Sequence, residues 1–157
     1  MQESINIRLM NIIDKYRIPH KLIDFEITET TADNTNDSLD KIMKYFNEKG
    51  INFSLDDFGT GYSNQSNIMQ YPYSIVKIDK SMVWACDSNP KAFVSLKHTV
   101  AMIKDLDMVV LAEGVETEEQ KKLLNEIGVE YLQGYYFSRP LPVAEIVNIL
   151  KENISKN

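Results

Sequence analysis

The sequence has 157 residues, a formal net charge of −6, 43% hydrophobic residues and 25% charged residues, which is typical of one globular domain. The acidic balance argues against binding to a nucleic-acid polymer, because that requires clustered Lys and Arg. Cys86 is the only cysteine, so neither an internal disulfide nor a thiolate metal site is expected. No apolar run approaches the roughly 20 residues of a membrane-spanning helix, and a cytoplasmic location is the default expectation.

The first half of the chain alternates between predicted helices and strands. Apolar residues at helical spacing predict a first helix over residues 4–17, and Pro19 ends it. Gly50 closes the second predicted helix in the manner of a left-handed cap. The elements that follow the first helix are a strand over 21–28, a helix over 38–50, a strand over 51–57 and a short helix or turn over 64–71.

The second half continues the same alternation. Its predicted elements are a strand over 74–79, a helix over 90–106, a strand over 108–114, a helix over 117–128, a strand over 130–134 and a helix over 143–153. Strands that alternate with helices through short connections indicate an α/β fold with a parallel sheet.

Polar residues stand at the end of each predicted strand. They are Glu26 and Glu29, the pair Asp56 and Asp57, Lys77 with Asp79, Glu113, and Gln133. The carboxyl ends of parallel strands lie on one face of the sheet, and ligands bind there. The sequence therefore predicts that these acids, a lysine and an amide converge.

Converging carboxylates require a compensating charge, because adjacent acids in a desolvated site repel each other. Divalent cations with oxygen ligands, such as Mg²⁺, provide it. An aspartate pair at a strand end can bridge two metals about 4 Å apart, a geometry suited to phosphodiester cleavage. Each residue alone has an ordinary alternative: Asp56 and Asp57 as a cap or turn, and Lys77 as a partner of Asp79. The prediction depends on the coincidence across five strands.

Five motifs in order resemble the EAL-domain family of cyclic di-GMP (c-di-GMP) phosphodiesterases. They are FEITET, DDFGTGYS, VKIDKSMV, LAEGVETEEQ and YLQGYYFSRPLP, between Phe25 and Pro142. The resemblance implies a partial TIM-type (β/α) barrel of about five βα units, with residues 1–157 forming a single incomplete domain that contains the later part of the barrel. The reaction it implies is hydrolysis of c-di-GMP to linear pGpG with two Mg²⁺ or Mn²⁺ ions.

The resemblance also implies a role for each strand-end residue. Glu26 matches a ligand of the first metal, Asp56 matches the aspartate that bridges both metals, and Asp57 and Glu113 match ligands of the second metal. The same resemblance implies that Glu113 is a catalytic residue as well as a metal ligand.

Four further positions are matched outside the metal ligands. Lys77 matches the lysine beside the attacking water, and Gln133 matches a residue that orders the water or a metal-bound glutamate. Glu29 matches the anchor of the loop after the aspartate pair, and Asp79 matches a strand-end acid on the substrate side.

Two features of the family are absent from this sequence: the early strand with the Glu-Ala-Leu motif and the next strand with an asparagine ligand. We expect Met1 to lie within the helix that follows those strands, which leaves the first metal without two ligands.

Three hypotheses follow: a phosphodiesterase, an inactive module that binds c-di-GMP or a protein partner, and a structural fragment. Because two ligands of the first metal are missing, we expect the isolated chain not to hydrolyse c-di-GMP. Because five strands cannot close a barrel, we expect a second copy, another chain, a swapped element or the N-terminal helix to cover the sheet edges.

Overall fold

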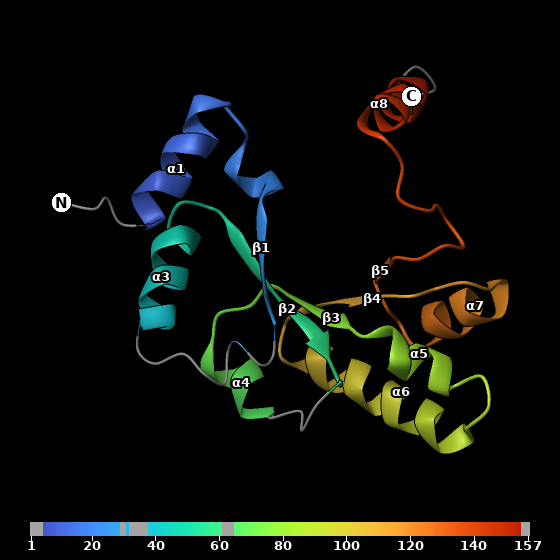
Figure 1. Cartoon of the computed structure of the whole chain (residues 1–157). Coiled ribbons are helices and arrows are strands. Elements are labelled where there is room, and N and C mark those ends of the chain that lie inside the picture. Colours follow the sequence, from blue (N-terminus) through green and yellow to red (C-terminus); the bar gives the residue numbers. More distant parts are fainter. Residues whose placement is uncertain (1–4, 29–30, 32–37, 61–64, 155–157) are drawn as a thin grey trace.

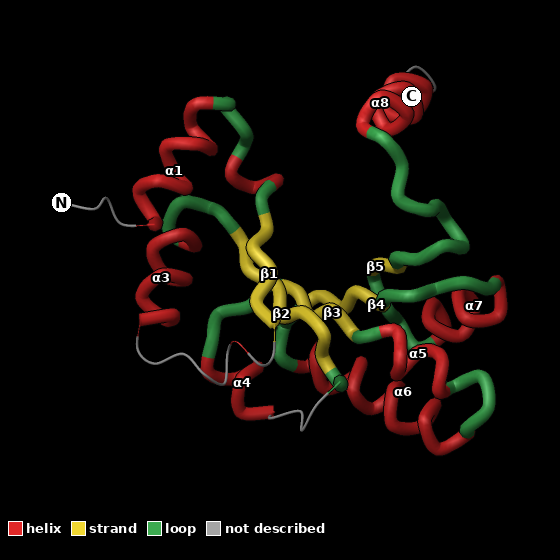
Figure 2. The backbone as a smooth tube through the Cα atoms, viewed as in Figure 1, coloured by secondary structure: helices red, strands yellow, loops and turns green. Residues whose placement is uncertain are grey.

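The computed structural model describes residues 5–28, 31, 38–60 and 65–154. Its centre is a five-stranded sheet in which neighbouring strands follow chain order and every pair is parallel (Figures 1 and 2). The strands are β1 (Asp24–Thr28), β2 (Asn52–Phe58), β3 (Ile75–Ile78), β4 (Val109–Ala112) and β5 (Tyr131–Leu132). The predicted α/β fold with a parallel sheet is confirmed.

Helices connect the strands, as parallel pairing requires. They are α1 (Ile5–Lys15), the 3₁₀ turn η1 (His20–Leu22), α3 (Ser38–Asn47), α4 (Gln65–Gln70), α5 (Lys80–Ala85), α6 (Pro90–Asp105), α7 (Glu118–Glu126) and α8 (Val143–Ile154). Helix α3 packs against β2, and α6 packs against β4 and α5.

The core lies between the sheet and these helices. Phe46 of α3 makes edge-to-face contacts with Phe25 of β1 and Phe53 of β2, at ring-centroid distances of 5.1 and 6.2 Å. Such aromatic pairs add about 0.5–1.5 kcal/mol to the stabilisation from area burial. In α6 the residues Leu96 and Val100 are fully buried at helical spacing. The amphipathic patterns of α3 and α6 therefore place their apolar faces on the sheet.

The structure corrects the predicted start of the first strand and adds one helix that was not predicted. Residues 20–22 form η1 instead of the start of a strand, because Leu22 N donates to Pro19 O at 2.9 Å and Ile23 N donates to His20 O at 2.9 Å. Helix α5 was not predicted, since six residues are too few for a clear helical period. Asp79 caps that helix by accepting a hydrogen bond from Ser81 N at 2.8 Å.

The two edges of the sheet differ from its centre. Within the described residues, β1 pairs only with β2 and β5 pairs only with β4. Helix α8 stands away from the sheet at the end of an extended segment (Figure 1). Its Val143 is 77% exposed, and none of its described residues belongs to the buried core. In the part of the chain that the structure describes, no helix is both long and apolar enough to cross a membrane.

Candidate functional site

Lys77 lies at the centre of the predicted site. It is in β3, and its Nζ lies 2.7 Å from Glu26 Oε1, 2.8 Å from Asp56 Oδ1 and 2.9 Å from Glu113 Oε1. These carboxylates come from β1, from β2 and from the residue after β4. An ammonium has three hydrogen-bond donors, so one lysine matches three carboxylates. The structure therefore brings together four of the predicted site residues from four neighbouring strand ends.

Burial makes this cluster electrostatically significant. The Lys77 side chain is 8% exposed. Burial would lower the pKa of Lys77, but the interactions with Asp56, Glu26 and Glu113 outweigh that effect and raise the pKa above its ordinary value. Lys77 therefore remains charged and holds the carboxylates in place.

The position of Asp57 depends on a distortion of β2. Side chains alternate across a regular strand, so adjacent aspartates would point to opposite faces. The register of β2 against β3 shifts between Leu55 and Phe58, and Asp57 has a left-handed φ of 58°. A bulge of this kind re-aims a side chain, and a non-glycine residue in this conformation is typical of functional sites.

Three carboxylates meet as a result of this bulge. One oxygen from each of Asp56, Asp57 and Glu113 lies within 4.8 Å of the others, a spacing that fits one metal ion. Asp56 Oδ1 is buried, and Lys77 Nζ lies 2.8 Å from it. A carboxylate oxygen has more than one lone pair, so Asp56 Oδ1 can accept from Lys77 and still ligate a hard divalent cation. The residues predicted for the second metal therefore fit such an ion.

Glu26 has a different environment. Its Oε1 accepts a hydrogen bond from Lys77 Nζ at 2.7 Å, and its side chain is 54% exposed. Among the described residues, the trio with metal-ligand spacing does not include it. The ligands predicted for the first metal, Glu26 and Asp56, are bridged here by the lysine.

Gln133 follows β5 at the margin of the cluster. Its backbone N donates to Ala112 O at 2.9 Å, and its O accepts from Val115 N at 3.0 Å. These bonds place Gln133 beside Glu113 in a cavity of about 230 Å³. Its assigned role stays a prediction, as does the substrate-side role of Asp79, which in this structure caps α5. Glu29, the predicted loop anchor, lies outside the described residues.

Three residues next to the site were not predicted. Trp84 of α5 donates its indole Nε1–H to Gly114 O at 2.8 Å and so supports the peptide after Glu113. A Cβ on Gly114 would lie 2.2 Å from Lys80 Cβ. A Cβ on Gly134 would lie 2.1 Å from Val115 O. In the sequence, only the glycines of AEGVE and LQGYY could have indicated these close approaches. The contacts themselves join residues that are distant along the chain, so the sequence does not show them.

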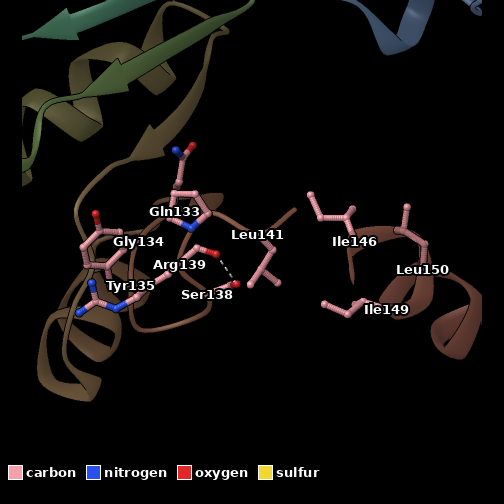
Figure 3. Close-up of a pocket in the computed structure, with 10 residues that line it drawn as sticks. Gln133, Gly134, Tyr135, Ser138, Arg139, Leu141, Ile146, Ile149 and Leu150 are labelled. Atoms are coloured by element: carbon pink, nitrogen blue, oxygen red, sulfur yellow. Dashed lines mark hydrogen bonds between the residues drawn. The ribbon is translucent and has the colours of Figure 1, made fainter. Parts of the chain in front are cut away.

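On its other side, Gln133 borders a second hollow. The segment after β5 and helix α8 face each other across about 430 Å³. Tyr135, Arg139 and Leu141 lie on one side and Ile146 and Leu150 of α8 on the other (Figure 3). The apolar side chains of α8 thus face a hollow and are not packed into the core.

Comparison with known proteins identifies the family. The EAL domain model matches residues 1–140, so the chain belongs to the EAL domain family. The signaling protein YkoW of Bacillus subtilis is 39% identical over 149 residues, which cover 94% of this chain and 18% of YkoW. The probable cyclic di-GMP phosphodiesterase PdeA of Escherichia coli is 32% identical over 145 residues, which cover 92% of this chain and 20% of PdeA.

A solved structure agrees with the sequence relatives. BlrP1 of Klebsiella pneumoniae, in complex with calcium and cyclic di-GMP, superposes with a TM-score of 0.80 at 30% identity. The match covers 86% of this chain and 34% of BlrP1. The chain therefore spans about a fifth of the two curated relatives and about a third of this solved chain.

Proposed function

We propose that the chain forms the later part of a c-di-GMP phosphodiesterase domain that hydrolyses its substrate to linear pGpG. The observation that carries this proposal is the convergence of Asp56, Asp57 and Glu113 within 4.8 Å of one another beside the buried Lys77. Membership of the EAL family and the c-di-GMP bound to BlrP1 support the choice of substrate.

The residues of the site suit the chemistry of a phosphodiester. The trio Asp56, Asp57 and Glu113 would hold the cation, for which we propose Mg²⁺ or Mn²⁺ because both favour carboxylate ligands. Such a cation supplies Lewis acidity toward a phosphate oxygen and lowers the pKa of bound water. Lys77 would place a positive charge beside the scissile phosphate. The Gln133 amide would hydrogen-bond the attacking water or Glu113.

A turnover assay tests the enzymatic proposal. The purified chain is incubated with c-di-GMP and Mn²⁺, and pGpG is quantified by chromatography. We expect Asp56→Ala to reduce turnover to background, because Asp56 touches both Lys77 and the cation position. Asp40→Ala is a matched control, since Asp40 forms an exposed pair with Lys44 on α3. Turnover that survives Asp56→Ala would refute the proposed site.

An inactive binding module is the second candidate. The pairing of Glu26 with Lys77 favours it, because this pairing occupies a carboxylate predicted for the first metal. Calorimetry with c-di-GMP separates the two candidates: binding without pGpG formation supports the module. If neither the nucleotide nor Mn²⁺ binds, both candidates fail and the structural hypothesis remains.

The open edges of the sheet support a proposal about partners. The outer edge of β1 and the outer edge of β5 lack a neighbouring strand among the described residues. Unpaired parallel edges and an exposed α8 favour association. We propose that a second copy of the chain covers them, with another chain as the alternative occupant. Light scattering after gel filtration tests this, and a stable monomer contradicts the second copy.

We also propose a cytoplasmic location. The single cysteine, Cys86, excludes the internal disulfides that are common in secreted domains. Fractionation of cells that express a tagged chain, followed by immunoblotting, tests this proposal.

A further inference from the structure

We infer that Gln120 is a positioning residue for the proposed site. Linked to Asp87, its side chain holds the backbone of residues 114–116 and so fixes where Glu113 lies. Gln120 is in the first turn of α7, whereas Glu113 directly follows β4. The inference rests on the proposed function for the role of Glu113. It adds a residue of α7, an element that supplies none of the carboxylates around Lys77.

Gln120 has a buried side chain with a partner for each end of its amide. The residue is 5% exposed. Its Oε1 accepts from Glu116 N at 2.8 Å and from Thr117 N at 3.2 Å, and its Nε2 donates to Asp87 Oδ2 at 2.9 Å. A flipped amide would direct its N–H groups at two backbone donors and its oxygen at a carboxylate. The network therefore admits one orientation, and a buried amide that lost these partners would be costly.

A helix cap explains only part of this arrangement. Thr117 is the N-cap of α7, and it forms a capping box in which its side chain accepts from Gln120 N while the Gln120 side chain accepts from Thr117 N. A capping box requires neither the bond from Glu116 N nor the bond to Asp87. Those two bonds reach the segment after β4 and the turn after α5. Gln120 therefore links three parts of the chain.

Helix α5 and the turn that follows it hold this segment at both of its ends. Trp84 of α5 donates its indole N–H to Gly114 O at 2.8 Å. At the other end, Gln120 connects Asp87 to the peptide of Glu116. Because both ends are tied to one region, the peptide between them cannot shift without breaking a hydrogen bond.

The segment carries Glu113 at its start and contacts Gln133 in its middle. Glu113 N donates to Ile78 O at 3.0 Å, and Glu113 Oε1 lies 2.9 Å from Lys77 Nζ. Val115 is fully buried, and its N donates to Gln133 O at 3.0 Å. Glu113 and Gln133 line the same cavity of about 230 Å³. A shift of the segment would therefore move both side chains relative to Lys77, and site groups tolerate little displacement.

Gln120→Glu tests the link, because a carboxylate keeps the acceptor but replaces the donor to Asp87 with a second negative charge. We expect the affinity for c-di-GMP, measured by calorimetry in the presence of Mn²⁺, to fall at least fivefold. Adding Asp87→Asn to this variant again opposes a donor to an acceptor, so the double variant should return to within twofold of the native affinity.

Thr117→Ala is the matched control. It removes the side-chain cap of α7 but leaves the bond between Gln120 and Asp87, so it should lower the thermal midpoint and keep the affinity within twofold of the native value. NMR spectroscopy of the carboxyl carbon of Glu113 gives a second measurement that needs no nucleotide. This signal should move in Gln120→Glu, return in the double variant and stay in place in Thr117→Ala.

A native affinity or a native Glu113 signal in Gln120→Glu would overturn the inference. An equal loss of affinity in Thr117→Ala, or a folded double variant that does not recover, also refutes it. If Gln120→Glu does not fold, Asp87→Ala removes the same link at an exposed residue and should lower the affinity at least threefold. A native affinity in that variant then refutes the inference. If the native chain binds no c-di-GMP, the proposed function fails, and the Glu113 signal alone decides this inference.

Discussion

The centre of the sheet and its edges differ in whether their polar and apolar groups have partners within the chain. At the centre, Lys77 pairs with three carboxylates, and the strands beneath it are buried by α3 and α6. At the edges, β1 and β5 each have one neighbour among the described residues, and the apolar side chains of α8 line a hollow and remain partly exposed. The comparison teaches that a site can be built by the middle strands of a sheet whose outer elements still require a partner.

Removal of a central aromatic ring should have the largest effect. Phe46 is 1% exposed and contacts Phe25 and Phe53, so Phe46→Ala should cost about 3–5 kcal/mol of unfolding free energy. Leu150→Ala on α8 should change it by less than about 0.5 kcal/mol in the monomer. Urea unfolding of both variants measures the difference. A comparable loss for Leu150→Ala would mean that α8 is packed in solution.

The second largest loss of stability is expected when Gly134, which lies close to the backbone of Val115, is replaced by alanine. A Cβ there would meet Val115 O at 2.1 Å, so Gly134→Ala should cost about 1–3 kcal/mol and weaken nucleotide binding through the neighbouring Gln133. Gly50 has a φ of +81° with nothing within 4 Å of a Cβ, so Gly50→Ala should cost about 1 kcal/mol through the backbone alone. Urea unfolding and calorimetry on both variants test this. Equal binding by the two variants would contradict the link to Gln133.

The Trp84 indole should contribute a smaller amount. Trp84→Phe keeps an aromatic ring but removes the donor to Gly114 O, and it should cost about 1 kcal/mol. If Gly114 positions Glu113, Mn²⁺ affinity should fall severalfold as well. Val94→Ala, at an exposed position of α6, is the control for thermal unfolding and Mn²⁺ titration. Unchanged Mn²⁺ affinity in Trp84→Phe would show that the bond only stabilises the fold.

The smallest expected effect is the contribution of His20, which precedes β1, to the pH dependence of the unfolding free energy. His20 hydrogen-bonds Lys49 O at 2.8 Å and Asp14 Oδ1 at 3.2 Å, and these bonds raise the pKa of His20 above its ordinary 6.5. Because the folded pKa is raised, the stabilisation is fully present below pH 6.5 and is lost as pH rises through the folded value. The difference in urea midpoint between the native chain and His20→Gln should therefore shrink from pH 5.5 to pH 8. A constant difference would refute the link.

The sequence indicated much of the fold because its helices are long and periodic and its strands end in polar residues. It missed α5, which has six residues, and it placed the start of β1 too early, at a segment that hydrogen bonds fold into η1. The same local limits apply to the site. The adjacent aspartates were visible, but regular alternation would have separated them, and the bulge that unites them depends on pairing between β2 and β3.

The sequence by itself determined the alternation of strands and helices, the polar residues at the strand ends and the family resemblance, since each is set by neighbours along the chain. Only the tertiary structure decided that Lys77 contacts Glu26, which is 51 positions away, and that Asp56, Asp57 and Glu113 converge. It also decided that α8 lies apart from the sheet. The physical reason is that register, bulges and burial arise from contacts between distant segments, and those contacts fix where each charge lies.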